Sequence, residues 1–412
     1  MTLLAASVWL HERRVGELRQ DDVGYLEFHP DQRWLEDSER PVLGHWFEQR
    51  PGRRQRGARP GDLPPFFANL LPEGDLGLLL RDRLGIATHD DLGLLTAVGE
   101  DLPGAAVVRT ETEEGAPPLL VPARPADQPG ADDSGMRFSL AGVQLKFSML
   151  RSGGRFHFPG KDERGNWIVK IALENYAGLC ANEFVTMEWA RRAGFEVPPC
   201  ELRQLGDLVD VPHEGDPETP VFVIRRYDRD GERRIHQEDM MQVLGYPNQP
   251  STRKYNDATY DQLTSLLVGI AGPATFDEML HRIVFMIASG NNDAHLKNWS
   301  LLYPDGIAAT LTPLYDQTFA GQWPALDGSL ALKLGGAKPF AAIEMGRVRE
   351  FARRADRDPD RAAELAASTI ERIAEAWTAL RREIAVPEAY LAPLRRHWGA
   401  VPVLAPHAAL IA

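Results

Sequence analysis

Apolar and polar positions follow short-range patterns in the first 110 residues, and these patterns predict a small strand-rich unit. The stretch at 7–30, SVWLHERRVGELRQDDVGYLEFHP, predicts three short strands with a glycine at each turn. Two short apolar helices are predicted from PPFFANLLPEG at 64–74 and LGLLLRDRLGI at 76–86. We therefore expect residues 1–110 to form one leading unit.

A second strand-rich block follows a stretch of different composition. Residues 111–135 are rich in Pro, Gly, Ala and acidic residues and are expected to form a linker or mobile loop. Strands are predicted within MRFSLAGVQLKFSMLR at 136–151 and NWIVKIAL at 166–173, and a helix from about Ala177 to Gly194. The interval 136–228 is thus predicted to be a small lobe of strands with one helix.

From about residue 235 the apolar spacing becomes helical. The segment TFDEMLHRIVFMIASG at 275–290 carries one apolar face at helical spacing, and residues 361–384 carry a similar stripe. A hairpin is predicted for WSLLYPDGIAATLTPLYD at 299–316. The chain is therefore expected to be α+β, with a large helical C-terminal lobe at 229–412.

Composition limits the classes of function. A chain of 412 residues is expected to contain two or three domains, and its net charge of −13 argues against the bare chain gripping nucleic-acid phosphates. Cys180 and Cys200 are the only cysteines, which excludes a cysteine zinc site and suits a reducing compartment. The N-terminus resembles a strand more than a signal peptide, and no window is apolar enough for a membrane span. We expect a cytoplasmic protein without a membrane partner.

The segment GNNDAHLKNWS at 290–300 places many polar side chains between an apolar helix and a hairpin. Taken alone, such a segment is most often a solvated turn. However, Asp293 and Asn298 have the Asp-x-x-x-x-Asn spacing of kinase catalytic loops, in which Asp meets the substrate hydroxyl and Asn binds Mg²⁺. Asp316 ends the next hairpin as a second oxygen ligand, and Lys170 lies inside an apolar strand of the other lobe. Together, in this order, they predict a site for ATP and Mg²⁺.

Two further residues belong near this site. His295 lacks companion ligands for zinc and is expected to hydrogen-bond the loop or the phosphates. Glu183 follows Lys170 on the predicted helix, and it either pairs with that lysine or lies on the surface.

Several motifs together resemble the HipA family of serine/threonine kinase toxins from bacterial toxin–antitoxin modules. The resemblance covers roughly residues 5–390 and implies a two-lobed, protein-kinase-like fold with a small N-terminal subdomain. The matching segments are FFANLLPEG (66–74), FSLAGVQLKFSM (138–149), WIVKIAL (167–173), RRYDR (225–229), IHQEDMMQVLG with KY (235–255), GNNDAHLKNWSLL (290–302) and LTPLYDQ (311–317).

The resemblance also implies roles for individual residues. Asp293 would be the catalytic base, Asn298 and Asp316 would hold Mg²⁺, and Ser139 would be the site of an inactivating autophosphorylation. A phosphate on Ser139 would add negative charge beside that of ATP, which gives the inactivation a physical basis. The residues that would contact ATP are Gly142, Gln144, Lys146, Lys170, Arg225, Tyr227, Asp228, Gln237 and His295. Among these, the backbone at Arg225 and Tyr227 would bind adenine, and Asp228 would lie near the ribose.

The function implied by the resemblance is a serine/threonine protein kinase acting as a toxin, with an aminoacyl-tRNA synthetase as the family's precedent for a substrate. The implied partner is a HipB-like helix-turn-helix antitoxin, through which any contact with operator DNA would be made. Two alternatives stay open at this point. One is a small-molecule or lipid kinase of the same fold, because fold does not fix substrate. The other is an inactive corepressor that works with an antitoxin.

Overall fold

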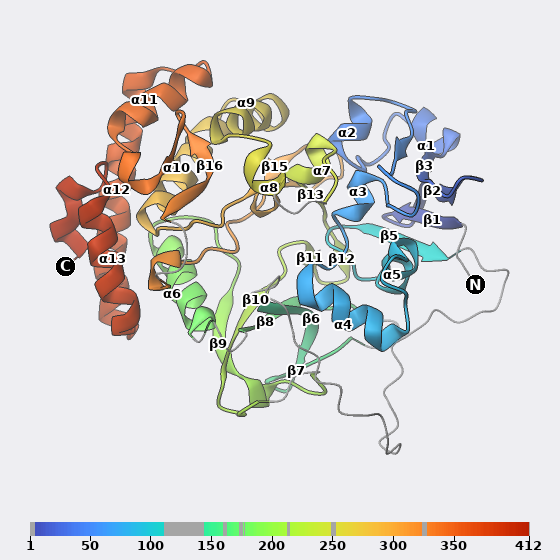
Figure 1. Ribbon diagram of the computed structural model, residues 1–412, viewed down its shortest axis with the longest axis horizontal. Helices are drawn as coiled ribbons and strands as arrows, with labels where there is room; N and C mark the ends of the chain where they lie inside the picture. Colours follow the sequence, from blue (N-terminus) through green and yellow to red (C-terminus); the bar gives the residue numbers. More distant parts are fainter. Residues whose placement is uncertain are drawn as a thin grey trace.

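The computed structural model describes most of the chain in three connected parts (Figure 1). The predicted linker at 111–135, Ser139 and Gly142 lie outside the described residues. The domain boundaries drawn from the sequence stay predictions. The described residues are 5–110, 144–159, 163–172, 176, 178–211, 215–248, 253–323 and 328–411.

The N-terminal unit, residues 5–110, is built on a five-stranded antiparallel sheet in the order β4-β3-β2-β1-β5. The three strands predicted at its start are confirmed, but a glycine at the first turn is wrong, because that turn lies at residues 11–12 and Gly16 lies within β2. Its own apolar core includes Phe28 and Phe67, whose ring centroids lie 5.0 Å apart. The elements are β1 (Ala5–Leu10), β2 (Arg13–Gln20), β3 (Leu26–Pro30), α1 (Gln32–Glu36), α2 (His45–Glu48), β4 (Gln55–Arg56), α3 (Pro65–Ala68), α4 (Gly74–Leu84), α5 (Asp91–Ala97) and β5 (Ala106–Thr110).

The small lobe is a second antiparallel sheet, in the order β7-β6-β8-β10-β9, with helix α6 packed on one face. Alternation along β8 sends Val169 and Ile171 to one apolar core and Lys170 to the opposite face. In the pairing of β6 with β8, Lys146 lies directly opposite Lys170, so both lysines share that face. The elements are β6 (Gln144–Ser152), β7 (Arg155–His157), β8 (Trp167–Ala172), α6 (Leu179–Arg192), β9 (Cys200–Gln204) and β10 (Pro220–Arg225).

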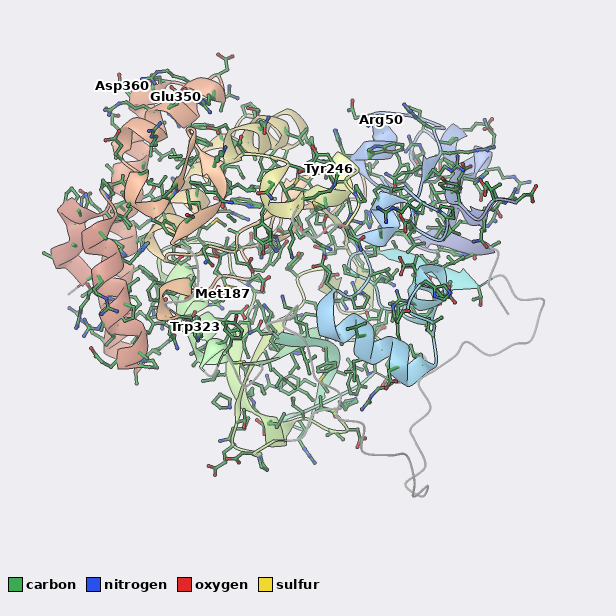
Figure 2. All side chains as sticks on the ribbon, in the orientation of Figure 1. Arg50, Met187, Tyr246, Trp323, Glu350 and Asp360 are labelled. Carbon is green, nitrogen blue, oxygen red and sulfur yellow. The ribbon has the colours of Figure 1, made fainter. Side chains whose placement is uncertain are left out.

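The helical lobe carries the rest of the described chain, and α6 is buried against it. Trp189 on α6 lies 4.7 Å from Trp377 on α12 between ring centroids, and Met187 on α6 is fully buried (Figure 2). The helices predicted near 275–290 and 361–384 and the hairpin are confirmed. The elements are β11 (Arg229–Asp230), β12 (Arg233–Arg234), β13 (His236–Asp239), α7 (Met240–Leu244), α8 (Arg253–Asn256), α9 (Tyr260–Ala271), α10 (Thr275–Ala288), β14 (Ser300–Tyr303), β15 (Thr310–Leu311), β16 (Ser329–Leu334), β17 (Ala337–Pro339), α11 (Met345–Arg354), α12 (Pro359–Glu383) and α13 (Glu388–Ala400). Among the described helices, none has the length and apolar character needed to cross a membrane.

A buried ionic network joins the N-terminal unit to the segment between the two lobes. Arg226 and Arg229 each donate to Asp101 of the N-terminal unit at 2.9 Å. Both arginines also bind Asp228, which additionally accepts from the backbone N–H of Gly104 at 2.7 Å. Burial favours the neutral form of Asp228, but the two guanidinium groups outweigh it and lower its pKa to about 2. The network fixes the N-terminal unit against the segment that follows β10.

We predict that Asp228→Asn destabilises the protein by roughly 3–5 kcal/mol, because two buried guanidinium groups would keep only Asp101 of their two shared carboxylates. The measurement is urea unfolding followed by tryptophan fluorescence. The matched control is Glu100→Gln, which removes the charge of an exposed pair with Arg109 and is expected to cost less than about 1 kcal/mol. Equal unfolding midpoints for the two variants would show that the network contributes little.

Candidate active site

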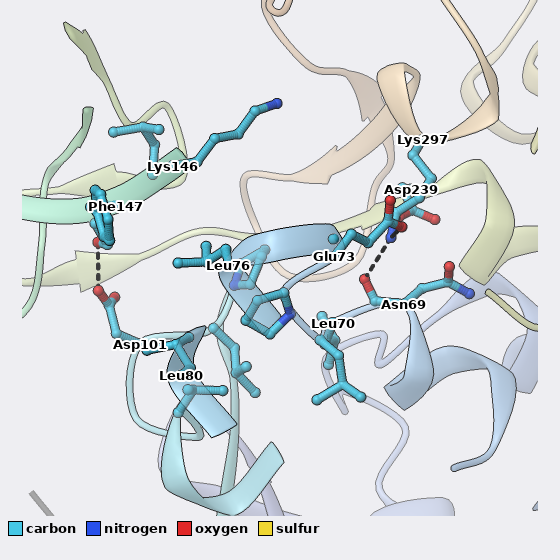
Figure 3. Close-up of a pocket in the computed structure, with 18 of the residues that line it drawn as sticks. Asn69, Leu70, Glu73, Leu76, Leu80, Asp101, Lys146, Phe147, Asp239 and Lys297 are labelled. Atoms are coloured by element: carbon cyan, nitrogen blue, oxygen red, sulfur yellow. Dashed lines mark hydrogen bonds and ion pairs between the residues drawn. The ribbon is translucent and has the colours of Figure 1, made fainter. Parts of the chain in front are cut away.

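A cavity of about 3190 Å³ lies where the N-terminal unit, the small lobe and the helical lobe meet (Figure 3). This exceeds the roughly 300–1,000 Å³ typical of small-ligand pockets. The predicted site residues that the structure describes all line it: Gln144, Lys146, Lys170, Arg225, Tyr227, Asp228, Gln237, Asp293, His295, Asn298 and Asp316. The structure therefore brings together side chains from segments that are far apart in the sequence.

Lys170 is the buried cation of the cavity, with 4% of its surface exposed. Its Nζ lies 2.5 Å from Oε1 of Glu183, a fully buried residue on α6, and it also donates to Asp316. Burial alone would lower the pKa of Lys170, but the two carboxylates raise it above its ordinary value, so the ammonium stays charged. Of the two sequence readings for Glu183, the pairing with Lys170 is confirmed and the surface position is wrong.

Asp316 is held by three neighbours. Lys170 and Lys146 both contact its carboxylate, Lys146 at 3.3 Å from each oxygen, and Asn298 Nδ2 donates to Oδ2 at 2.9 Å. Desolvation favours the neutral form of Asp316, which is partly buried, but these cations hold its pKa well below its usual range. The backbone of Asp316 has a φ of 57°, a left-handed conformation that Asp adopts more readily than most residues. Such conformations cluster at functional sites.

The oxygens of Asn298 and Asp316 fit a magnesium ion. Because the amide nitrogen of Asn298 faces Asp316, its buried Oδ1 is left without a hydrogen-bond partner among the described residues. A free amide oxygen beside a carboxylate matches the hard ligands of Mg²⁺, which takes its remaining ligands from phosphates and water. Within the described ranges there is no cluster of three or more His, Cys, Asp or Glu side chains that could hold a metal ion.

Asp293 lies on the loop after α10, and three neighbours shape its surroundings. Its backbone N–H donates to Asn291 Oδ1 at 2.9 Å, and its Oδ1 accepts from the hydroxyl of Tyr255 at 2.5 Å. His295 Nε2 lies 4.0 Å from the same oxygen. Burial lowers the pKa of His295 to about 4, so the ring is neutral near pH 7 and can serve as a hydrogen-bonding group. The side chain of Asp293 is 58% exposed to the cavity and solvent, so its carboxylate is accessible to a bound molecule.

The residues predicted for adenine and ribose also line the cavity. Tyr227 donates its hydroxyl to Gln237, and the backbone N–H of Arg225 is already bonded to Pro199 O at 2.8 Å. Asp228 lines the cavity, but both of its oxygens are engaged in the ionic network described above. The structure therefore gives Asp228 a structural role, and a ribose contact by this residue stays a prediction that the geometry does not support.

Four residues near Asp293 were not predicted as site residues: Glu73, Lys254, Tyr255 and Lys297. They occur within the sequence segments FFANLLPEG, KY and GNNDAHLKNWSLL, but no spacing rule marks them as chemical groups. Their proximity comes from tertiary contacts, for example that between Glu73 and Lys297 at 2.6 Å.

Comparisons with known proteins agree with this architecture. Residues 6–109 match the family model described as the HipA N-terminal domain, and residues 138–377 match the HipA-like C-terminal domain. The predicted kinase Y4dM of Sinorhizobium fredii is 34% identical over 388 residues, which is 92% of each chain. The serine/threonine-protein kinase toxin HipA of Shewanella oneidensis is 29% identical over 299 residues, covering 65% of this chain and 66% of that protein.

A solved structure supports the fold. The complex of HipA, HipB and operator DNA from Shewanella oneidensis MR-1 matches with a TM-score of 0.73 at 22% identity, covering 98% of this chain and 96% of that chain. This likeness confirms the predicted two-lobed, kinase-like fold with an N-terminal subdomain.

We predict that Asn298→Ala weakens the binding of ATP in the presence of Mg²⁺ by roughly tenfold, or about 1.4 kcal/mol, because the free amide oxygen is lost. When EDTA removes the Mg²⁺, the same substitution should change the affinity for ATP much less. Isothermal titration calorimetry with and without Mg²⁺ measures both. The control is Asn256→Ala, at an exposed position outside the cavity lining. An equal loss in EDTA would argue that Asn298 does not act through a metal ion.

Proposed function

This chain belongs to the HipA family of kinases, and on that premise we propose that it transfers the γ-phosphate of ATP to a serine or threonine hydroxyl of a protein. The observation that carries the proposal is the meeting of Lys170, Asn298 and Asp316 on one side of a cavity that also exposes Asp293. Phosphoryl transfer depends on such positioning and charge stabilisation more than on covalent chemistry by the protein.

The proposed reaction assigns one task to each group. Lys170 and Lys146 would turn from Asp316 to the phosphates of ATP, while Glu183 keeps Lys170 oriented. Asn298 Oδ1 and the carboxylate of Asp316 would hold Mg²⁺, which neutralises charge on the phosphate groups when it is bound. Asp293 would accept the proton of the acceptor hydroxyl. At the same time the hydroxyl oxygen would bond to the γ-phosphorus, and the bond between the γ-phosphorus and ADP would break.

The exposure of Asp293 supports a protein acceptor. An enzyme for a small metabolite commonly encloses its acceptor in a pocket, whereas this carboxylate is 58% exposed and opens into a cavity of about 3190 Å³.

The pairing of Lys170 with Glu183 supports an active enzyme over an inactive corepressor. Burying this ion pair has a desolvation cost, and a site without catalytic function would gain nothing that offsets it. We therefore favour the protein kinase over both alternatives.

The family premise extends the proposal to regulation and partners. We propose autophosphorylation at Ser139 as a means of self-inactivation and a HipB-like antitoxin as the partner that contacts operator DNA. The relative in Shewanella oneidensis is named a toxin, and its solved structure is a complex with HipB and operator DNA. An aminoacyl-tRNA synthetase in the cytoplasm is the substrate we would test first.

The test is phosphoproteomics after brief expression of the wild-type chain and of Asp293→Asn. We expect new phosphoserine or phosphothreonine on one or a few proteins, and a loss of at least about 100-fold in the variant, because a general base contributes roughly 10²–10⁴-fold. The control is Asp360→Asn, which removes a carboxylate on the far edge of the helical lobe (Figure 2) and should leave labelling unchanged.

Two results would contradict the proposal. One is labelling of the same proteins by Asp293→Asn at the wild-type level. The other is a wild-type chain that phosphorylates a metabolite or lipid and no protein, including itself. The same data report whether the peptide containing Ser139 is phosphorylated.

A further inference from the structure

The N-terminal unit reaches the catalytic loop through a short segment between α3 and α4. Glu73 in this segment lies between two lysines of the helical lobe, with Oε1 2.6 Å from Lys297 Nζ and Oε2 3.3 Å from Lys254 Nζ. The same Lys297 donates to the backbone oxygen of Asn69 at 3.1 Å. Figure 3 shows Glu73, Asn69 and Asp239 gathered around Lys297.

Each of the two lysines is adjacent in sequence to a group at the proposed reaction centre. Lys254 precedes Tyr255, whose hydroxyl donates to Asp293 Oδ1 at 2.5 Å. Lys297 precedes Asn298, whose amide binds Asp316 and leaves the free oxygen that fits a metal ion. The carboxylate of Glu73 therefore bridges Lys254 and Lys297. Lys254 is next to Tyr255, which contacts the proposed base, and Lys297 is next to Asn298, the proposed metal ligand.

The local structure around Lys254 makes this bridge important. Helix α8 has four residues, Arg253–Asn256, none of them buried, and a helix of one turn is marginal without tertiary contacts. The position of Tyr255 thus depends on what α8 touches, and the ion pair of Lys254 with Glu73 is one such contact. Phosphoryl transfer is sensitive to this position, because a shift of about 1 Å at a reacting centre can cost roughly 100-fold in rate.

Glu73 is ionised near neutral pH. Desolvation raises the pKa of Glu73, whose side chain is still 43% exposed, but Lys297 and Lys254 together lower it to about 2. Asp239 lies farther from Lys297, at 3.8 Å, and burial raises its pKa to about 6. Glu73 is therefore the closer and more strongly ionised partner of Lys297.

We propose that Glu73 is a positioning residue for phosphoryl transfer, supplied by the N-terminal unit, that holds Lys254 and Lys297 and through them Tyr255 and Asn298 around Asp293. The proposal rests on the kinase function proposed above. Glu73 contacts neither Lys170 nor Asp293 itself, and Asn298 keeps its own hydrogen bond to Asp316, so the effect of Glu73 should fall more on turnover than on ATP binding.

The first measurement is steady-state transfer of phosphate from radiolabelled ATP to the chain itself and to dephosphorylated casein. We expect Glu73→Gln to lower kcat roughly tenfold and to change the KM for ATP less than about twofold. Glu73→Asp, which keeps the charge, should recover part of the loss. Lys254→Met should lower kcat, and adding it to Glu73→Gln should cost less than the two separate effects combined, because both act through one contact.

The matched control is Glu48→Gln. Glu48 also belongs to the N-terminal unit and pairs with Arg40 at 2.5 Å, but it lies outside the cavity lining. This variant should keep the wild-type kcat. If Glu73→Gln and Glu48→Gln both keep it, or if Glu73→Gln raises only the KM for ATP, the positioning role is overturned.

The second measurement does not depend on activity. Amide hydrogen exchange should rise at 253–256 and 293–298 in Glu73→Gln and stay at the wild-type level there in Glu48→Gln. Unchanged exchange in Glu73→Gln overturns the inference even if the enzyme is active. A wild-type chain that transfers phosphate to no protein instead overturns the proposed function, and the exchange data still decide whether Glu73 holds the two segments.

Discussion

The structure depends on one buried charge, the ammonium of Lys170. The lysine comes from a strand of the small lobe, Glu183 from the helix packed on that strand, and Asp316 from the segment after the hairpin of the helical lobe. Removing such a group from water is costly unless opposite charges meet it, and a carboxylate buried without its cation is equally unfavourable. The three segments must therefore come together, and this requirement fixes how the two lobes face each other around the cavity.

The same contacts prepare the site for a ligand of opposite charge. In the structure, the carboxylate of Asp316 balances Lys146 and Lys170, and the amide of Asn298 completes its hydrogen bonds. Phosphates could take the lysines while a metal ion takes the carboxylate, so each group would exchange one charged partner for another. An exchange of this kind leaves no buried charge unpaired, which limits the cost of nucleotide binding to a rearrangement of side chains.

The sequence was sufficient for features encoded by short-range patterns. Short apolar runs bounded by turn residues predicted the early strands and the strand of Lys170, and helical spacing predicted α10 and α12 because burial of one helix face imposes that period. The spacing of Asp293 and Asn298 predicted a site because a single loop presents both. Their chemical roles stay predictions, although the structure places them in one cavity with Asp316 and Lys170.

The remaining contacts could not be predicted because they join distant segments. Glu73 and Lys297 are 224 residues apart, and Asp101 and Arg226 are 125 apart, with no local pattern linking them. The expectation for Asp228 illustrates the difficulty. Its motif suggested a nucleotide contact, whereas its carboxylate compensates two buried arginines. Which acid pairs with which base is decided by tertiary packing, and a sequence pattern gives only the candidates.

These long-range pairs change the role of the N-terminal unit. It contacts the segment between the lobes through Asp101 and the loop that carries Asp293 through Glu73, and a third contact runs from the backbone of His45 to the buried Glu238. The first contact lies beside the proposed nucleotide wall and the second beside the proposed base. A rigid body attached at these points cannot move without disturbing both sides of the cavity. The N-terminal unit is therefore better understood as a third wall of the proposed active site than as an appended domain.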